Sequence, residues 1–485
     1  MSEQSLKNKT VKGVGWQAID KVANYGISFI VGIILARLLS PDEYGLLGII
    51  GIFIAVFNII LDSGLSTALI RKQDATEEDY CTVFHTNLIL SFFLTASLFF
   101  GAPLIAKFFE RPELIPLVRV MSFIIIINAL SLTQQASLTK KVDFKTLTKV
   151  SVISHVASGV IGIAMAFAGC GVWALVAQQL SSRGFSTLLL WIYNKWVPKL
   201  IFSRRSFKEL FGFSWKLLTA SIIDTLFRQM YQTVIGKCYS PATLGQYTRA
   251  SQYANMGSST FGMVVKNVSF PVLSSIQNDK GRMKDAYRQI IKVSMFASFV
   301  MMFMLAACAK SLILVLIGEK WLPCVPMLQI LCFEMVLYPL HLININMIIV
   351  QGRSDVQLIL QIVKSCLAVV PLLLGVYVDI YWMLWGSVVV GIISFFLNSF
   401  FSGKSLGYTS WMQIRDVAPS LGIAIAVALP MYLLSFLPWN EFVLLPIQVV
   451  AGCAIGLSLC EKTRLGEYLE VKNIFLAAIK KISKK

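Results

Sequence analysis

The sequence contains few charged residues and very few histidines. Charged side chains make up 14% of the 485 residues and hydrophobic ones 56%, and the mean hydropathy is +0.72. A soluble domain must cover its surface with polar groups, so this composition excludes one and indicates an integral membrane protein. The 3 histidines and 9 scattered cysteines include no CxxC pair, which argues against a zinc site and a disulfide framework. We therefore expect no metal and no cofactor.

Other absences narrow the chemistry further. The nearest approach to a phosphate-binding loop is Gly403-Lys404-Ser405, but Asn398 stands where that loop requires its first glycine, which excludes an ATPase. The segments expected on the extracytoplasmic side are all brief, which argues against an enzyme that recognises a glycan acceptor there. The N-terminal SEQSLKNKTVKGVGW lacks a short apolar core followed by a cleavage site, so we expect no cleavable signal peptide.

Long apolar stretches fill most of the chain. A helix needs about 20 residues to cross the hydrocarbon core of a bilayer, and roughly fourteen stretches have this length. The predicted fold class is therefore an all-α polytopic membrane protein. We place the spans near 14–39, 44–68, 83–106, 114–138, 149–169, 172–194, 212–237, 243–272, 290–317, 325–351, 356–377, 380–402, 414–437 and 442–460.

The positive charge is distributed by membrane topology. The net charge is +18, and lysine and arginine collect in every second loop and at both ends of the chain. Cytoplasmic loops carry such an excess, so we expect both termini in the cytoplasm. Anionic lipids are the expected partners of these clusters, and nucleic acid is not. The basic tail 463–485 is predicted to form an amphipathic cytoplasmic helix, or else a tail that only reinforces topology.

An internal repeat divides the chain. The motif Leu39-Ser-Pro-Asp-Glu-Tyr-Gly45 after the first predicted span is echoed by Tyr239-Ser-Pro-Ala-Thr-Leu-Gly245 after the seventh. An offset of six spans preserves orientation in the membrane, so we predict two parallel six-helix lobes with the substrate between them. The predicted regions are 1–200, 201–405, two additional helices in 406–462, and the tail 463–485.

Charged residues inside the predicted spans are the candidate site, because each is costly in a bilayer and therefore usually functional. Asp20, Lys21 and Asp62 fall at a similar depth, which predicts a local ion pair or a proton site. Cations in spans one, seven and eight together cover the full depth of the membrane, as expected for the path of an anion. The alternative is that these charges form interhelical pairs that only fix packing, and Asp224 and Arg228 can neutralise each other at i,i+4 spacing.

Span ten combines two titratable groups with a proline. Glu334 and His341 flank Pro339, which removes a backbone hydrogen bond and loosens the helix. This pattern favours a hinge with a proton relay. The titratable candidates for coupling transport to protons or sodium are Asp20, Asp62, Asp224, Glu334 and His341.

Four sequence motifs lie in the part of the chain that holds the first ten predicted spans: GISFIVGIILARLLSPDEYGLLGII at 26–50, LTKKVDFK at 138–145, GCGVWALVAQQL at 169–180 and YSPATLGQYTRASQ at 239–252. In these motifs the chain resembles the Wzx-type polysaccharide exporters, in particular the colanic-acid-exporter branch. The resemblance covers most of the first ten spans and implies membership of the multidrug/oligosaccharidyl-lipid/polysaccharide (MOP) superfamily, with a MATE-like pair of rocking lobes in the bacterial inner membrane.

The resemblance also implies a cargo. This would be an undecaprenyl-diphosphate-linked oligosaccharide, carried from the inner to the outer leaflet for surface polysaccharide biosynthesis without enzymatic activity. The expected partners are this lipid-linked oligosaccharide, anionic lipids and, as a further candidate, a polysaccharide polymerase or another biosynthetic membrane protein. The candidate contacts of the diphosphate and sugars are Lys21, Arg183, Lys216, Arg228, Arg249, Lys266 and Lys364.

Three other functions stay open from the residues. An ion-coupled multidrug or cation antiporter of the same superfamily predicts a mainly anionic cavity, and a membrane glycan polymerase or ligase predicts carboxylates at an external rim. A flippase for the peptidoglycan precursor also carries a diphosphate. The excess of cations in the spans favours transport of an anionic lipid.

Overall fold

The structure is a computed structural model that describes residues 3–463, 466–469 and 472. Within the helices, the side chains of 3–14, 18, 213, 216, 217, 220, 259–268 and 354 lie outside the described set. The described residues form helices and connecting turns, without any strand, which confirms the all-α class. Of the tail 463–485, for which an amphipathic helix is predicted, residues 464–465, 470–471 and 473–485 lie outside the description.

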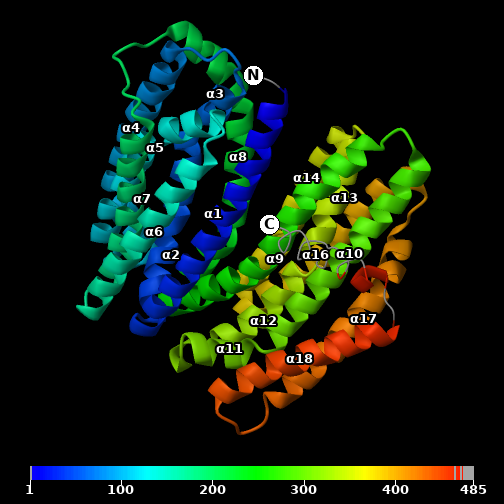
Figure 1. Cartoon of the computed structure of the whole chain (residues 1–485). Coiled ribbons are helices and arrows are strands. Elements are labelled where there is room, and N and C mark those ends of the chain that lie inside the picture. The colour runs from blue at the N-terminus through cyan, green and yellow to red at the C-terminus, as the bar shows by residue number, and fades with distance from the viewer. Residues whose placement is uncertain (1–2, 464–465, 470–471, 473–485) are drawn as a thin grey trace. The chain divides into compact units, whose positions relative to one another are not determined.

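The chain packs as two compact units, Met1–Gly245 and Gln246–Lys485 (Figure 1). The first contains α1 Glu3–Leu38, α2 Pro41–Asp62, α3 Leu65–Arg71, α4 Glu77–Phe109, α5 Leu114–Lys140, α6 Phe144–Phe167, α7 Val172–Asn194, α8 Arg204–Cys238 and the start of α9 Pro241–Ser275. The second contains α10 Lys280–Ala307, α11 Ala309–Leu316, α12 Cys324–Met335, α13 Tyr338–Val350, α14 Ser354–Leu367, α15 Val369–Tyr377, α16 Ile380–Gly403, α17 Ser410–Leu434 and α18 Glu441–Thr463, with short 3-10 turns at Glu319–Trp321 and Lys404–Leu406. The division into regions ending at 200, 405 and 462 stays a prediction.

Most of the helices are long and apolar enough to cross a membrane. Within the described part of the chain, 11 segments meet both conditions, so the protein is a multi-pass membrane protein. Three further helices coincide with predicted spans: α7 has 23 residues, α8 has 35 and α9 has 35, and each is long enough but more polar. The predicted number of about fourteen spans therefore depends on these three helices.

In the first unit, helix pairs pack in a continuous bundle. The helix α4 lies against α5, α6 lies against both α1 and α7, and α2 lies against α8. Leu65, Leu69, Val83 and Ala136 are buried together where α3, α4 and α5 meet. This apolar cluster fixes the end of the unit at which α3 turns into the loop before α4.

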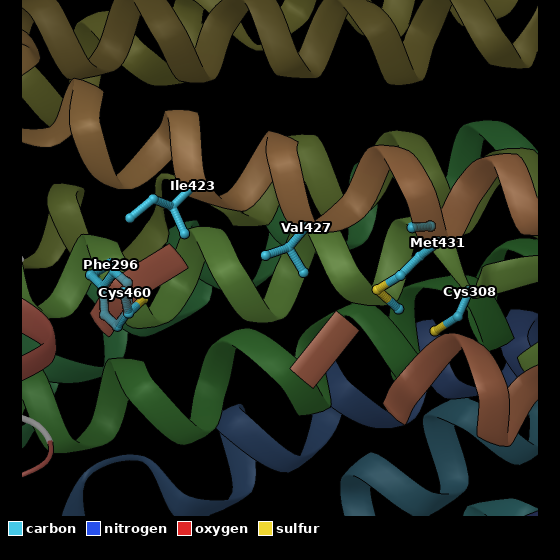
Figure 2. Close-up of a cluster of buried hydrophobic side chains, with 7 residues drawn as sticks. Phe296, Cys308, Ile423, Val427, Met431 and Cys460 are labelled. Atoms are coloured by element: carbon cyan, nitrogen blue, oxygen red, sulfur yellow. The ribbon is translucent and has the colours of Figure 1, made fainter. Parts of the chain in front are cut away.

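In the second unit, the last two long helices share a core with α10. Ile423, Val427 and Met431 follow one another along α17 at i,i+4 spacing and pack with Phe296 of α10 and with Cys460 of α18 (Figure 2). A glycine at position 452 lets α18 approach closely, because a β-carbon there would lie 2.3 Å from the sulfur of Met431.

The sequence repeat appears as a reciprocal contact between the N-termini of α2 and α9. A β-carbon added at Gly45 would lie 1.8 Å from the carbonyl oxygen of Pro241, and one added at Gly245 would lie 1.9 Å from the carbonyl oxygen of Pro41. The second residue of each motif is a serine whose hydroxyl caps the following helix, Ser40 for α2 and Ser240 for α9. Glycine is thus required in both copies so that the two backbones can touch.

We predict that Gly45→Ala destabilises the protein by about 1–3 kcal/mol, the usual cost of overpacking against atoms that cannot move aside. Thermal unfolding of the purified protein in detergent measures the effect. The matched control is Gly51→Ala on the same helix, where no atom lies within 4 Å of the added carbon. Equal melting temperatures for the two variants would contradict the close crossing.

Candidate functional site

The predicted acidic residues near the start of the chain lie in different environments. On α1, Asp20 accepts a hydrogen bond of 3.0 Å from Asn24, which also donates to Ser151 of α6 at 2.6 Å. The neighbouring Lys21 is exposed. In the described set, no hydrogen bond or ion pair joins Asp20 to Asp62, which is the last residue of α2. Asp20 therefore contributes to the contact between α1 and α6.

The helix α8 carries an ion pair. The Arg228 guanidinium lies 2.9 Å from the Asp224 carboxylate, and their side chains are 69% and 54% exposed. This contact agrees with the alternative that these two charges neutralise each other. Since both side chains face out of the first unit, the pair remains accessible and contributes little to stability.

Two arginines on the polar helices α7 and α9 differ in burial. Arg183 on α7 is exposed, and none of the described residues offers it a hydrogen bond or an ion pair. Arg249 on α9 is only 5% exposed, donates to Gln252 at 2.6 Å and lies over the ring of Trp321 with 6.0 Å to the centroid. Arg183 is therefore exposed on its helix, whereas Arg249 is packed into the interior of the second unit.

Two predicted cations cannot be located. Lys216 lies on α8 and Lys266 on α9, but both are at positions whose side chains are outside the described set. Their roles as substrate contacts stay predictions.

In the second unit, the predicted residues Lys364 and His341 both contact the side chain of Asn398. Asn398 on α16 is fully buried; its carbonyl oxygen lies 3.4 Å from the Lys364 ammonium on α14, and its amide nitrogen lies 3.3 Å from Nδ1 of His341 on α13. The amide oxygen of Asn398 thus accepts a hydrogen bond from Lys364, and its amide nitrogen faces the His341 imidazole. Lys364, Asn398 and His341 form one cluster across three helices, which we call the amide-bridged cluster.

The sequence pattern contained a weak signal for Asn398. It is a single amide within a long apolar stretch, and a polar side chain in such a position usually has a specific partner. Sequence reasoning used it only as a departure from a phosphate-binding loop. Its two partners lie 34 and 57 residues away in the chain, so no local spacing links them.

The helix is broken next to Pro339, as the proline predicts, while its action as a hinge stays a prediction. The helix α12 ends at Met335 and α13 begins at Tyr338, with the proline in the first turn of α13. Glu334 lies within hydrogen-bonding reach of the Ser387 hydroxyl, which also donates to the carbonyl of Leu384. No hydrogen bond between Glu334 and His341 is found in the described residues, so the two groups flank the helix break without direct contact.

A second buried polar group holds the second unit together. The Tyr287 hydroxyl on α10 donates to the Asn344 side chain on α13 and contacts Ser402 on α16 at 2.8 Å. Gln413 on α17 donates to both Tyr287 and Asn344 at 3.3 Å. Since all four side chains are fully buried and mutually bonded, this network ties four helices together rather than offering a site.

A cavity of about 660 Å³ opens between α10, α12, α16 and α17. Its lining is almost entirely apolar and includes Phe303, Phe333, Trp385 and Leu429. None of the charged candidate residues is among the described residues that line it. The described charged candidate residues of the second unit therefore do not contribute to this apolar cavity.

Comparison with known proteins identifies the family. Residues 34–326 match the family described as "Polysaccharide biosynthesis protein". This match covers more than half of the chain. The chain belongs to the polysaccharide biosynthesis protein family.

Curated relatives of this polysaccharide biosynthesis protein span most of its length. The teichuronic acid biosynthesis protein TuaB of Bacillus subtilis (strain 168) is 27% identical over 354 residues, covering 72% of this chain and 73% of TuaB. The succinoglycan biosynthesis transport protein ExoT of Rhizobium meliloti (strain 1021) is 28% identical over 331 residues, 68% of this chain and 67% of ExoT. The lipopolysaccharide biosynthesis protein WzxC of Escherichia coli (strain K12) is 22% identical over 439 residues, 89% and 88%. The resemblance to polysaccharide exporters is confirmed.

Solved structures share the fold of this family member. The lipid II flippase MurJ in an inward closed conformation superposes with a TM-score of 0.73 at 16% identity, covering 91% of this chain and 97% of MurJ. An inward-facing MATE family multidrug resistance transporter of the MOP superfamily gives a TM-score of 0.62 at 17% identity, covering 79% and 95%. The expected MATE/MOP-like fold is confirmed.

The amide-bridged cluster can be tested by a double-mutant cycle. Asn398→Leu and Lys364→Met should each lower the free energy of unfolding, and together they should be non-additive by about 0.5–1.5 kcal/mol because they remove one shared hydrogen bond. Chemical unfolding in mixed micelles measures the four free energies.

The control cycle pairs Lys364→Met with Asn346→Leu. Asn346 is another buried amide of α13, but it donates to Ser269 at 2.8 Å instead. These two substitutions should be additive. Additivity in both cycles would show that Asn398 and Lys364 are not coupled.

Proposed function

We propose that this protein is a flippase that moves undecaprenyl-diphosphate-linked oligosaccharide repeat units from the cytoplasmic to the periplasmic leaflet for surface polysaccharide biosynthesis. The observation that carries the proposal is the family match over residues 34–326. It is supported by the names of relatives, which refer to teichuronic acid, succinoglycan and lipopolysaccharide biosynthesis. The protein acts by transport rather than as an enzyme.

The distribution of cations supports an anionic cargo. Of the seven predicted substrate-binding cations, five lie on α7, α8 and α9, the long helices that are too polar to be counted among the apolar segments. A diphosphate that crosses a region of low dielectric constant needs cations along its path, because the charge is otherwise left without solvation. The polyprenyl chain requires no such contacts, since it can stay in lipid.

We place the protein in the bacterial inner membrane with both termini in the cytoplasm. In this proposal α7, α8 and α9 also cross the membrane, with their polar sides against water or protein rather than lipid. The total then reaches the predicted fourteen or so spans, an even number that returns the chain to its starting side. Two lobes that rock in alternating access would be the parallel repeats predicted from the sequence.

The driving force is proposed to be a proton or sodium gradient, or removal of the flipped lipid by a polysaccharide polymerase. The carboxylates available for coupling are those predicted from the sequence. Of these, Asp224 already has a cationic partner in Arg228 at 2.9 Å. Asp62 and Glu334 lie next to helix breaks, which makes them the stronger candidates.

We predict that Arg183→Gln slows lipid flipping by about tenfold or more, the effect of losing roughly 1.5–3 kcal/mol from a charge-assisted hydrogen bond. The assay follows the leaflet exposure of a fluorescent undecaprenyl-diphosphate glycan in liposomes that contain the purified protein. The matched control is Arg119→Gln, since Arg119 of the same unit already stacks on Phe99 at 5.1 Å. The control should flip lipid within about twofold of the wild type, less than 0.5 kcal/mol in free energy.

The same liposomes separate this function from its alternatives. Extrusion of a cationic dye, without lipid movement under a proton or a sodium gradient, would replace the proposal with a cation antiporter. Equal flipping of the peptidoglycan precursor and the oligosaccharide lipid would show that the protein selects the diphosphate rather than the glycan. Normal flipping by Arg183→Gln would remove this arginine from the path.

A further inference from the structure

Four polar side chains of α2, α3, α4 and α5 carry buried nitrogen or oxygen atoms without a hydrogen-bond partner among the described residues, although the residues Asp62 and Ser66 are themselves only half-buried. Asn87 on α4 is fully buried, and neither its amide oxygen nor its amide nitrogen has a hydrogen-bond partner among the described residues. The same holds for the hydroxyl of Thr133 on α5, which is also fully buried, and for buried oxygens of Asp62 on α2 and Ser66 on α3. An unpaired polar group in an apolar interior costs free energy, so four in one region require an explanation.

These side chains lie in one layer of the bundle. The apolar cluster of the first unit joins Leu65, Leu69, Val83 and Ala136 of α3, α4 and α5. Each polar residue lies one helical turn from a member of this cluster: Asp62 from Leu65, Ser66 from Leu69, Asn87 from Val83, and Thr133 from Ala136. In the predicted topology all four steps point in one direction, toward the middle of the membrane. Because side chains three or four positions apart share a helix face, Asp62, Asn87 and Thr133 lie one turn beyond the apolar cluster on the faces that form it, and Ser66 lies between Leu65 and Leu69.

A satisfied polar contact bounds this layer on its other side. One turn before Asp62, Asn58 of α2 accepts a hydrogen bond of 2.8 Å from Asn128 of α5. The layer thus lies between a closed amide pair and an apolar cluster on the same helices. Asn87 and Thr133 are fully buried in this layer, and Asp62 and Ser66 are half-buried.

A helix break lies within the layer. Ser63 and Gly64 adopt positive φ angles of 42° and 71°, which ends α2 at Asp62 and starts α3 at Leu65. The C-terminal end of a helix carries partial negative charge and free carbonyl groups, and broken transmembrane helices use such ends to hold cations. The break therefore adds negative potential next to the Asp62 carboxylate.

No nearby lysine neutralises this layer by the contacts that the structure shows. Lys72, in the loop after α3, lies 3.1 Å from both Asp79 and Glu209. Lys140, at the end of α5, donates to the carbonyl of Lys72. Both ammonium groups are thus held by other partners, one or more helical turns from the layer. Neither lysine pairs with the Asp62 carboxylate, which can therefore bind another cation.

We propose that Asp62, Ser66, Asn87 and Thr133 form a binding site for a monovalent metal cation such as Na⁺. The set offers a carboxylate, an amide oxygen and two hydroxyls, which are hard oxygen donors suited to alkali and alkaline-earth ions rather than to metals that prefer nitrogen or sulfur. Only one of the four is negatively charged, which balances a single positive charge. Carbonyls at the end of α2 can complete the coordination.

Binding of the ion does not depend on which cargo the protein carries, whereas its use to couple transport rests on the proposed function. A cation at the break would join α2, α3, α4 and α5. Na⁺ binding can therefore be measured in detergent without any lipid substrate, and its failure is distinguishable from a failure to flip lipid.

The test measures the melting temperature of the purified protein against NaCl concentration, with choline chloride keeping the ionic strength constant. A ligand that binds only the folded state raises stability with the logarithm of its concentration, so Na⁺ should raise the melting temperature and choline should not. Asp62→Asn should abolish the Na⁺-dependent rise. Asp20→Asn, which removes a carboxylate of α1 outside the layer, should retain it.

A second pair of variants guards against a loss of folding in Asp62→Asn. Thr133→Val removes one ligand oxygen at nearly constant volume and should raise the half-maximal Na⁺ concentration by about tenfold, or about 1.4 kcal/mol. Thr95→Val is its control, because that hydroxyl donates to the carbonyl of Ser122 at 3.3 Å. Identical melting temperatures in NaCl and choline chloride would mean that the layer holds only water. That result, or an unchanged Na⁺ response in Asp62→Asn and Thr133→Val, would overturn the proposal.

Discussion

The dominant constraint on this chain is that polar groups within its apolar interior must find partners, because water is not available there to solvate them. The second unit meets it with a closed network in which Tyr287, Asn344, Ser402 and Gln413 bond one another across four helices. The relative positions of α10, α13, α16 and α17 follow from that requirement, since moving any of these helices would strand a buried donor or acceptor.

The first unit meets the same constraint less completely. Its paired amides, Asn58 and Asn128, lie beside a layer in which Asn87 and Thr133 are buried without partners in the described structure. A network that is satisfied fixes a structure, while a partly satisfied one is where a ligand gains most from binding. The contrast between the two units points to different roles for their buried polar groups.

Close backbone packing is the second element of this architecture. Gly45 packs against the backbone of Pro241, and Gly245 packs against the backbone of Pro41. The two copies of the repeated motif are therefore in contact at the N-termini of α2 and α9. Polar character is concentrated differently, in α7, α8 and α9, where an exposed Arg183 and the Asp224–Arg228 pair lie.

The sequence by itself determined the membrane class, most of the helices, the break at Pro339 and the Asp224–Arg228 pair. These features depend on composition or on residues within a few positions of one another, where helix geometry fixes the neighbours. Only the tertiary structure decided that Arg249 is buried against Trp321 and that Asn398 joins Lys364 to His341. These residues are separated by at least 25 positions, and the packing of helices, which no local period encodes, brings them together.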